Sequence, residues 1–596
     1  MNKIESTSLN LEEKNIEDLK KLFPNVVIEG KIDFGKLKLI LGEEIDDSIE
    51  KYQFTWNGKS KAIKLAQLPS TETLIPSKED SKNWDTTDNL YIEGDNLEVL
   101  KQLQKTYFGK IKMIYIDPPY NTGNDFVYKD DFTDSVANYR IQTNQQKKSN
   151  ADTSGRYHTE WMNLIYPRLM LAKNLLTDDG AIFVSIDDTE QSNLEKLMNE
   201  IFGENNHIKT LIVNTSEGGG QAKHVINGHE FVLVYAKDIS SFKDLMKPKD
   251  IRGKTIEKEG VKYWIQEDSI RKVHGKYGNL HYEEILEFKN EEFKEKIDKG
   301  ILNGEYMLLK KENNKHIIGK LRRLDEDYSK FHSILKHLTK FGKKDFQKYF
   351  KESDSENEVF PNPKPMSLIK ELVLSLTLHE SDCIILDFFS GSGTTANAVM
   401  ELNLEDNGNR KYILVQLPEK IHESEKAFKS GYRNICEIGR ERLIRAGKTI
   451  NAKRENENLG KYPLDIGFKS FQLDETNIKE WDSSLQVSEN TLFDHLELIK
   501  EDRTTEDVLY EILLKYGVFN QKIRTFSINN KEIYDVSNGY MIVNLTDHIE
   551  ENDIKDIVKL KPQVVVFLES AFSNDNDKLN AEYTLKRNGV KDIKCI

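Results

Sequence analysis

The amino-acid sequence predicts an α/β protein built on a doubly wound, largely parallel sheet. Short runs at 111–116, 383–389 and 411–417 are predominantly apolar, as expected of strands that are covered on both faces. Segments with apolar residues at helical spacing, such as 96–107 and 159–176, alternate with these runs. Strands that alternate with helices predict parallel pairing through right-handed crossovers.

The N-terminal part of the chain is less regular. Residues 1–75 contain one short helical pattern, at 11–23, and a few strand-like runs. The segment 69–89 is polar and contains two prolines, which predicts a linker. A strand at 90–94 and the helix at 96–107 follow, so the α/β pattern begins after this segment.

A long polar stretch, 138–158, separates the strand at 111–116 from the helix at 159–176. Loops of this length inside a compact domain are usually functional lids or disordered segments. Strands at 181–187 and 230–236 then continue the sheet.

Residues 238–355 interrupt the α/β rhythm because they are Lys-rich and irregular. Within 241–350, 26 Lys and Arg stand against 19 Asp and Glu, although the whole chain has a net charge of −14. Such a segment is either a phosphate-facing surface or a solvated lysine-rich surface, and charge alone does not decide between them. The rhythm resumes at 361–378, which predicts an insertion into one α/β domain, and from about 451 the chain becomes acidic.

The bulk properties narrow the class of protein. A chain of 596 residues is too long for one core, so several domains are expected. Cys383, Cys436 and Cys595 lack disulfide or metal-ligand spacing, which favours a reducing compartment. No secretory signal opens the sequence and no apolar run approaches the roughly 20 residues of a membrane helix. We therefore expect a cytoplasmic protein.

A glycine turn follows the strand at 383–389. The residues 391-GSGTTA-396 satisfy the G-x-G-x-x-G/A pattern, in which glycines let the backbone turn beneath a ligand. A dinucleotide site would place an acid on the ribose at the end of the next strand, where this chain has Gln416, which can still accept a hydroxyl hydrogen bond. The absence of an acid weakens the interpretation as an NAD site. S-adenosylmethionine has no pyrophosphate, so a shorter glycine turn is sufficient to bind it. The third interpretation is a turn that only connects a strand to a helix and binds no ligand.

The strand at 111–116 ends in Asp117-Pro118-Pro119-Tyr120. Ligands of open α/β sheets bind beyond the carboxyl ends of strands. A carboxylate beside a carbonyl held by prolines offers two acceptors, which match the two N–H bonds of a nucleobase amine. Tyr120 offers a face for stacking, and a base in duplex DNA would have to be flipped out. The alternative is a strand end with a core tyrosine.

The two motifs together resemble those of the amino-methylating DNA methyltransferases, with Asp-Pro-Pro-Tyr as catalytic motif and 387-DFFSGSG-393 as S-adenosylmethionine motif. The catalytic motif comes first, which resembles the β class. More specifically, the chain resembles the modification (Mod) subunits of type III restriction–modification systems. The segments that carry this resemblance are 83–104, 115–128, 161–190, 229–237, 360–369, 411–420 and 570–580.

This resemblance implies a circularly permuted, Rossmann-like methyltransferase fold with an inserted target-recognition domain and an extra C-terminal domain. The implied domains are an N-terminal segment at 1–80, the catalytic and cofactor-binding halves of the methyltransferase domain at 81–237 and 356–450, target recognition at 238–355 and a C-terminal domain at 451–596.

The resemblance also implies roles at matching positions. Asp117, the Pro118 carbonyl, Pro119 and Tyr120 would hold the flipped adenine. The implied S-adenosylmethionine contacts are Asp387, Phe388, Phe389, Ser390, Gly391, Ser392, Gly393, Thr394, Asp95, Asn362, Lys364, Pro365 and Gln416. Asp95 is equally well an N-cap of the helix that follows it. The sulfonium is already activated, so no metal is assigned.

The implied function is that of a site-specific DNA adenine-N6 methyltransferase and DNA-recognition subunit. Asp at 117 favours adenine over cytosine. Double-stranded DNA, a nuclease–translocase Res subunit and a second copy of the chain are the expected partners. The alternatives are an N4-cytosine methyltransferase of the same fold and a DNA-recognition scaffold with negligible methyl transfer.

Overall fold

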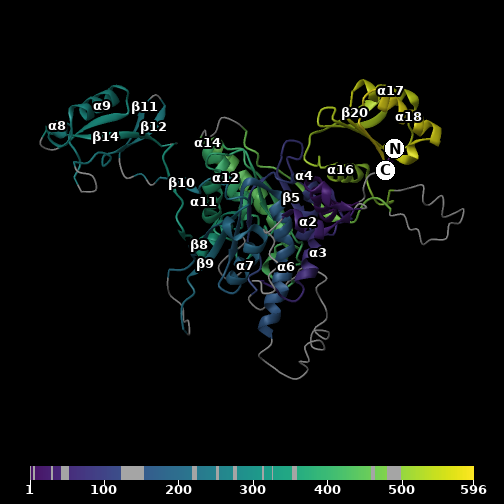
Figure 1. Ribbon diagram of the computed structural model, residues 1–596, viewed down its shortest axis with the longest axis horizontal. Coiled ribbons are helices and arrows are strands. Elements are labelled where there is room, and N and C mark those ends of the chain that lie inside the picture. The colour runs from purple at the N-terminus through teal and green to yellow at the C-terminus, as the bar shows by residue number, and fades with distance from the viewer. Residues whose placement is uncertain are drawn as a thin grey trace. The chain divides into compact units, whose positions relative to one another are not determined.

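The structure is a computed structural model of the chain (Figure 1). It describes residues 2–596 apart from the ranges 4–6, 29–30, 42–52, 122–152, 218–223, 250, 252–253, 259, 273–277, 312–313, 325, 352–358, 458–462 and 480–498. Of the long polar stretch 138–158, which was expected to be a lid or a disordered segment, residues 138–152 lie outside the described residues, and 153–158 belong to helix α6 (Thr153–Leu175).

The chain divides into two compact units. One contains Met1–Lys243, Ser333–Val373 and His379–Ile596, and the other contains Asp244–His332 and Leu374–Leu378. None of the helices in the described part of the chain combines the length and the apolar character that crossing a membrane requires.

The first unit contains a ten-stranded sheet with the order β16-β8-β9-β7-β6-β17-β18-β5-β19-β4. Neighbouring strands from β7 to β19 are parallel, whereas β9 and β4 pair antiparallel with their neighbours. The predicted α/β fold is therefore confirmed. The strands are β4 (Thr73–Lys82), β5 (Leu90–Glu93), β6 (Ile111–Ile116), β7 (Leu176–Ile186), β8 (His207–Asn214), β9 (His229–Ala236), β16 (Ile334–Lys336), β17 (Ile384–Asp387), β18 (Lys411–Gln416) and β19 (Phe468–Asp474).

The crossovers reverse direction between β6 and β17. Helix α6 connects β6 to β7 on one side, and α12 (Thr394–Asp406) connects β17 to β18 on the other. Right-handed crossovers in opposite directions place these helices on opposite faces. Accordingly α6 packs against α4 (Asn96–Tyr107), and α12 packs against α14 (Ile435–Glu457). The reversal makes the gap between β6 and β17 a topological switch point.

The central strands are apolar along their length because both of their faces are buried. All six side chains of β6 are buried, and Leu90, Tyr91 and Ile92 of β5 are as well. Strands without alternation need cover on both faces, and the two helix layers provide it.

The prediction of a linker at 69–89 is wrong in part, because β4 spans ten of these residues at the edge of the sheet. Proline lacks an N–H group and is tolerated on edge strands, where a neighbour is missing on one side. Pro76 lies opposite Phe471 of β19 in this position.

A six-stranded sheet with the order β1-β24-β23-β22-β21-β20 also belongs to the first unit. Its strands are β1 (Asn2–Lys3), β20 (Ile523–Ile528), β21 (Lys531–Val536), β22 (Met541–Asn544), β23 (Val564–Phe567) and β24 (Asp592–Cys595). Helices α17 (Glu551–Lys559) and α18 (Asp575–Arg587) pack against each other in the same region.

The second unit has a small core of its own. A four-stranded antiparallel sheet has the order β11-β12-β14-β13, formed by Thr255–Lys258, Val261–Gln266, His316–Arg323 and Tyr306–Lys310. Helix α9 (Glu291–Leu302) contacts β13. The buried residues of this core are Leu280, Ile285, Ile297 and Ile318.

Candidate active site

The two predicted motifs lie side by side at the carboxyl edge of the large sheet. β6 and β17 are neighbouring parallel strands, with Ile114 opposite Leu386. Asp117 directly follows β6, and Asp387 ends β17. Both strand ends therefore border the switch point, where open α/β sheets bind ligands.

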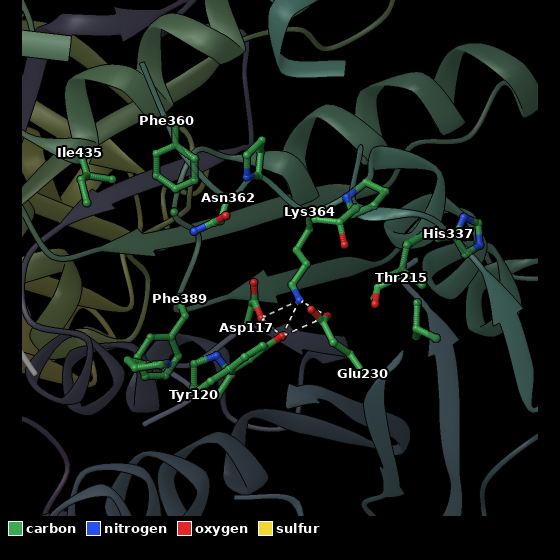
Figure 2. A pocket seen from close by; sticks show the side chains of 18 of the residues that line it. Asp117, Tyr120, Thr215, Glu230, His337, Phe360, Asn362, Lys364, Phe389 and Ile435 are labelled. Carbon is green, nitrogen blue, oxygen red and sulfur yellow. Dashed lines mark hydrogen bonds and ion pairs between the residues drawn. The ribbon is translucent and has the colours of Figure 1, made fainter. Parts of the chain in front are cut away.

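A cavity of about 520 Å³ opens at this edge, within the range of roughly 300–1,000 Å³ typical of small-molecule sites. Its lining comes from segments that are far apart in the chain, from Asp117 to Ile435 (Figure 2). The predicted site residues that line it are Asp117, Pro118, Pro119, Tyr120, Asn362, Lys364, Pro365, Phe389, Gly391 and Gln416.

Hydrogen bonds from Trp161 on α6 and to Glu190 hold the Asp-Pro-Pro-Tyr segment and the residue that follows it. The buried Trp161 indole donates a 2.7 Å hydrogen bond to the Pro119 carbonyl oxygen. Asn121 adopts a left-handed φ of 60° and donates from its amide to the buried Glu190 carboxylate. These contacts fix the turn that presents Asp117 and Tyr120 to the cavity.

Four polar groups converge in the cavity (Figure 2). The Lys364 ammonium lies 2.6 Å from Glu230 Oε2 and 3.3 Å from Asp117 Oδ1, and it also contacts the Tyr120 hydroxyl. Tyr120 donates to Asp117 Oδ1 at 2.8 Å. Asp117 is thus one member of a network of two carboxylates, one ammonium and one phenol.

The environment shifts the protonation of this network. Burial raises the pKa of the Asp117 carboxyl above its ordinary value; Lys364 opposes this shift and Glu230 adds to it. Burial alone would lower the pKa of Lys364, but attraction to Asp117 and Glu230 outweighs burial and raises it. The pKa of Tyr120 is raised by burial and by the same two carboxylates. The ammonium and the neutral phenol are therefore both favoured.

The glycine turn begins directly after β17. Gly391 and Gly393 have φ of +51° and +77°, a conformation that residues with a Cβ rarely adopt. A Cβ on Gly391 would lie 3.4 Å from the Phe360 ring, which is itself part of the cavity lining. The turn therefore exposes backbone to the cavity.

Asp387 supports this turn from inside the protein. Its buried carboxylate accepts hydrogen bonds from Thr395 Oγ1 at 2.5 Å and from the Phe389 N–H at 3.1 Å. Burial raises the pKa of Asp387 to about 7. The structure places Asp387 behind the cavity wall, so it shapes the turn through Phe389 and Thr395.

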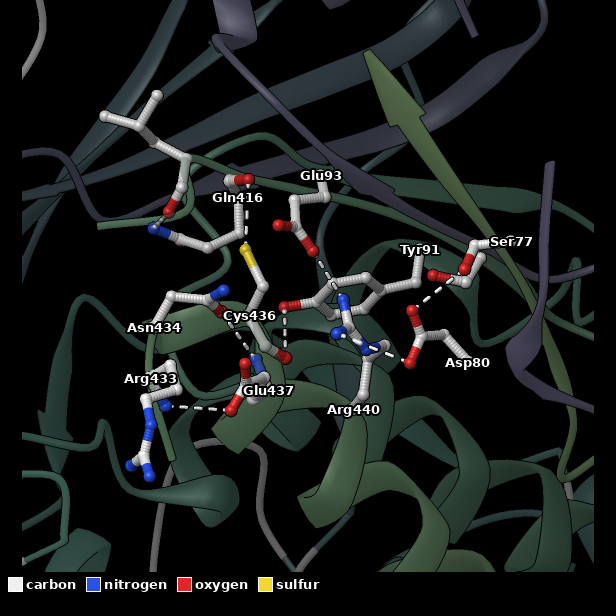
Figure 3. Close-up of polar contacts among 12 residues, drawn as sticks. Ser77, Asp80, Tyr91, Glu93, Gln416, Arg433, Asn434, Cys436, Glu437 and Arg440 are labelled. Carbon is white, nitrogen blue, oxygen red and sulfur yellow. Dashed lines mark hydrogen bonds and ion pairs between the residues drawn. The ribbon is translucent and has the colours of Figure 1, made fainter. Parts of the chain in front are cut away.

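Gln416 at the end of β18 also holds the turn. Its side-chain Oε1 accepts from the Gly391 N–H at 2.7 Å, so this acceptor is already engaged. The end of β18 is anchored in turn by α14, because Cys436 Sγ donates to the Gln416 carbonyl oxygen at 3.4 Å and the Cys436 carbonyl accepts from Tyr91 (Figure 3). Arg440, one turn further along α14, pairs with Glu93 at 2.5 Å.

The remaining predicted cofactor residues make contacts within the protein. Arg442 Nη1 donates to the hydroxyls of Ser392 and Thr394 at 2.8 and 2.7 Å, which directs both toward α14. Phe388 is fully buried, and the buried Ser390 hydroxyl has no hydrogen-bond partner among the residues that the structure describes. These residues surround the turn rather than line the cavity.

Asp95 caps α4 by accepting hydrogen bonds from the N–H groups of Leu97 and Glu98 at 2.8 and 3.4 Å. It also pairs with the buried Arg168 at 3.3 Å. Asp95 therefore acts as the N-cap of α4; its contact with the cofactor stays a prediction.

Sequence reasoning missed three charged residues of the site region. Glu230 and Glu419 line the cavity, and Arg442 binds the glycine turn from α14. Glu230 is the second residue of β9, which is antiparallel to β7 and therefore begins at the carboxyl edge, where Phe231 lies opposite Ile186. A polar residue at the start of an apolar strand was the available signal, but its place depended on the direction of that strand.

A family model described as DNA methylase (N6_N4_Mtase) matches residues 111–427, a span that includes both motifs. The chain is 31% identical over 530 residues to the type III restriction-modification enzyme EcoP15I Mod subunit of Escherichia coli, which covers 79% of this chain and 78% of that protein. It is 32% identical over 528 residues to the EcoPI Mod subunit of Escherichia phage P1, which covers 78% of each chain.

A third relative, the type II methyltransferase M.KpnI of Klebsiella pneumoniae, is 32% identical over 387 residues, which is 60% of this chain and 87% of that protein. The match to the Mod subunits extends further along the chain than the match to M.KpnI. The chain therefore belongs to the DNA methylases and, among them, to the family of modification subunits of type III restriction–modification enzymes.

Proposed function

We propose that this DNA methyltransferase acts on the N6 amine of adenine, with Asp117 and Tyr120 as the residues that contact the base. The observation that carries the proposal is the adjacency of β6 and β17, which puts Asp-Pro-Pro-Tyr and the glycine turn around one cavity. The catalytic strand β6 precedes the cofactor strand β17 in the chain, which is the circularly permuted order.

Asp117 and the Pro118 carbonyl are the proposed acceptors for the two amine hydrogens. The Pro119 carbonyl is already occupied by Trp161, and the prolines restrict rotation of the segment. Two acceptors on one amine draw its lone pair out of conjugation with the ring and make it a better nucleophile. Tyr120 offers its ring for stacking once the base has left the duplex.

The family uses S-adenosylmethionine, which supplies a methyl group on a positively charged sulfonium. The residues present fit this cofactor: the glycine turn leaves room for a close approach, and the cavity also has the apolar side chains of Phe360, Phe389 and Ile435. Asn362, Lys364 and Pro365 are the proposed residues near its methionine end. Gly391 and Phe389 would face its nucleoside part.

The Gln416 contact can be tested separately. We expect Gln416→Ala to raise KM for S-adenosylmethionine about five- to tenfold with little change in kcat, because one hydrogen bond to the Gly391 N–H is lost. Gln191→Ala is the matched control, since Gln191 contacts Glu195 within α7 (Gln191–Phe202). Initial rates over a range of cofactor concentrations give both constants, and an unchanged KM contradicts the expectation.

The rate of methyl transfer should depend on the ionisation of Asp117. Its pKa is raised above the ordinary 3.8, and the ionised carboxylate accepts an amine hydrogen more strongly than the protonated acid does. The rate should therefore be constant above the raised pKa and be lost as the pH falls through it. Single-turnover rates at saturating substrate between about pH 4 and about pH 8 measure this. If the rate fell only at a pH at or below the ordinary aspartate pKa of 3.8, the assignment of Asp117 would be contradicted.

The choice of adenine over cytosine rests on the acid at position 117. Digestion of modified DNA to nucleosides, followed by mass spectrometry, distinguishes N6-methyladenine from N4-methylcytosine. Expression in a methylation-free bacterium and genome-wide mapping of modified bases gives the target sequence in the same experiment. N4-methylcytosine as the product overturns the adenine assignment and leaves the fold unaffected.

We also propose that the predicted domain 238–355 reads the target sequence, mainly through the compact unit at 244–332. This unit has its own core, and the segment has an excess of basic residues. A Res subunit and a second copy of the chain are the proposed protein partners, with 1–75 and 451–596 available for contacts. The cytoplasm is the proposed location, where the DNA substrate lies. Light scattering on the purified chain tests the homodimer.

A further inference from the structure

The Lys364 ammonium contacts the Asp117 carboxylate, which the proposed reaction needs as an acceptor. The contact is with Asp117 Oδ1, which is the same oxygen that accepts the Tyr120 hydrogen bond (Figure 2). An amine that is to donate to Asp117 must compete with this ammonium, because a charged donor forms the stronger hydrogen bond. The proposed reaction therefore needs Lys364 to be held elsewhere.

Glu230 is placed to hold it. Its Oε2 lies 2.6 Å from the Lys364 ammonium, whereas Asp117 lies 3.3 Å from it. Glu230 also accepts from the Tyr120 hydroxyl at 3.4 Å. Its side chain reaches the cavity from β9, on the opposite side of Lys364 from Asp117, as Figure 2 shows.

We propose that Glu230 is a positioning residue that holds the Lys364 ammonium away from Asp117 and so leaves Asp117 free to accept the amine of the flipped base. This inference rests on the proposed function, because it assumes that Asp117 accepts that amine. Glu230 acts through Lys364 and has no contact with the base in this scheme.

The charge of the network supports the same role. Asp117, Glu230 and Lys364 together carry one net negative charge when all three are ionised, and this charge would stabilise the positive charge that the amine nitrogen gains as the methyl group passes to it from the sulfonium. Without Glu230 the remaining pair would be neutral, and Lys364 would have Asp117 as its remaining carboxylate in the network. Glu230 thus preserves both the free acceptor and the negative field that stabilises a cation.

Two substitutions test the proposal. Glu230→Gln keeps the size of the side chain and removes its charge, so kcat should fall about 10- to 100-fold while KM for S-adenosylmethionine changes less than threefold. Adding Lys364→Met removes the competing ammonium. The double variant Glu230→Gln/Lys364→Met should therefore be faster than Glu230→Gln alone.

This recovery is the discriminating result. If Glu230 merely stabilised the fold, adding Lys364→Met would lower kcat further or leave it unchanged. A double variant that is no faster than Glu230→Gln overturns the proposal. If Glu230→Gln does not fold, the double variant is compared with Asp117→Ala, and equal inactivity of the two overturns the proposal.

The chain offers a matched control. Glu200 on α7 (Gln191–Phe202) also pairs with a lysine, Lys59, at 2.7 Å and accepts from a tyrosine hydroxyl, that of Tyr166, at 2.7 Å. Glu200→Gln and Glu200→Gln/Lys59→Met should leave kcat within about twofold of wild type.

A crystal structure of Glu230→Gln gives a readout that does not depend on activity. The Lys364 ammonium is expected to move into direct contact with Asp117, closer than 3.3 Å. An ammonium that stays in place or turns away from Asp117 overturns the proposal. A wild-type protein that methylates no DNA would instead count against the proposed function, so the two failures are distinguishable.

Discussion

Asp117→Ala is expected to reduce methyl transfer by about 10²–10³-fold or more while leaving DNA affinity largely unchanged. The substitution removes the carboxylate that is proposed to orient and activate the amine. It leaves the second unit, 244–332, untouched, and this unit is proposed to provide most of the contacts to the target sequence. Single-turnover transfer of a labelled methyl group measures the first effect, and a gel-shift titration measures the second.

Asp188→Ala is the matched control for this substitution. Asp188 follows β7, the neighbour of β6 in the sheet, and lies 3.7 Å from His229. Removing it should change the rate less than threefold, because exposed ion pairs contribute little. An Asp117→Ala protein that still methylates at a rate near wild type would remove Asp117 from the mechanism. A wild type that binds DNA but never methylates it would support the scaffold alternative.

Gly342→Ala is expected to cause the second large effect, although Gly342 does not line the cavity. Gly342 lies in α10 (Thr339–Tyr349), where alanine would normally stabilise the helix by about 0.5–1 kcal/mol. Here a Cβ would overlap the Pro363 carbonyl oxygen and lie 2.9 Å from the Lys364 backbone carbon. The 362–365 segment must therefore shift.

We expect Gly342→Ala to lower the free energy of unfolding by about 1–3 kcal/mol, as overpacking does, and to lower kcat/KM at least tenfold. Thermal unfolding and methyl-transfer kinetics measure the two effects. Gly35→Ala in α2 (Phe34–Leu41) is the control, because its Cβ would meet the Asp33 side chain at 3.2 Å. If Gly342→Ala keeps wild-type kinetics, the position of Lys364 matters less than the proposed mechanism requires.

The two motifs could be predicted from sequence because each depends on neighbours in the chain. Apolar residues without alternation identify β6 and β17 as buried strands, and the residues that follow a buried strand lie at its carboxyl end. The glycines at 391 and 393 likewise report a local conformation, which the structure gives as a left-handed φ. Local chemistry of this kind does not require knowledge of the partners.

Roles that depend on distant partners were harder to predict. Ser392 and Thr394 belong to the motif, yet Arg442 draws their hydroxyls toward α14. Gln416 stands where an acid was expected, and its acceptor oxygen is used by Gly391. In each case the partner comes from a segment whose position is set by packing of the helices on the sheet.

By itself the sequence determined the fold class, the two motifs and the chemical groups that they offer. Only the tertiary structure decided that Lys364 and Glu230 meet at Asp117. The reason is physical: Asp117 follows β6 and Glu230 lies near the start of β9, in a sheet whose strand order differs from the order in the chain, and Lys364 lies in a loop between two helices. Direction and neighbour in a sheet are set by the packing of the whole unit, and no local pattern in the sequence specifies them.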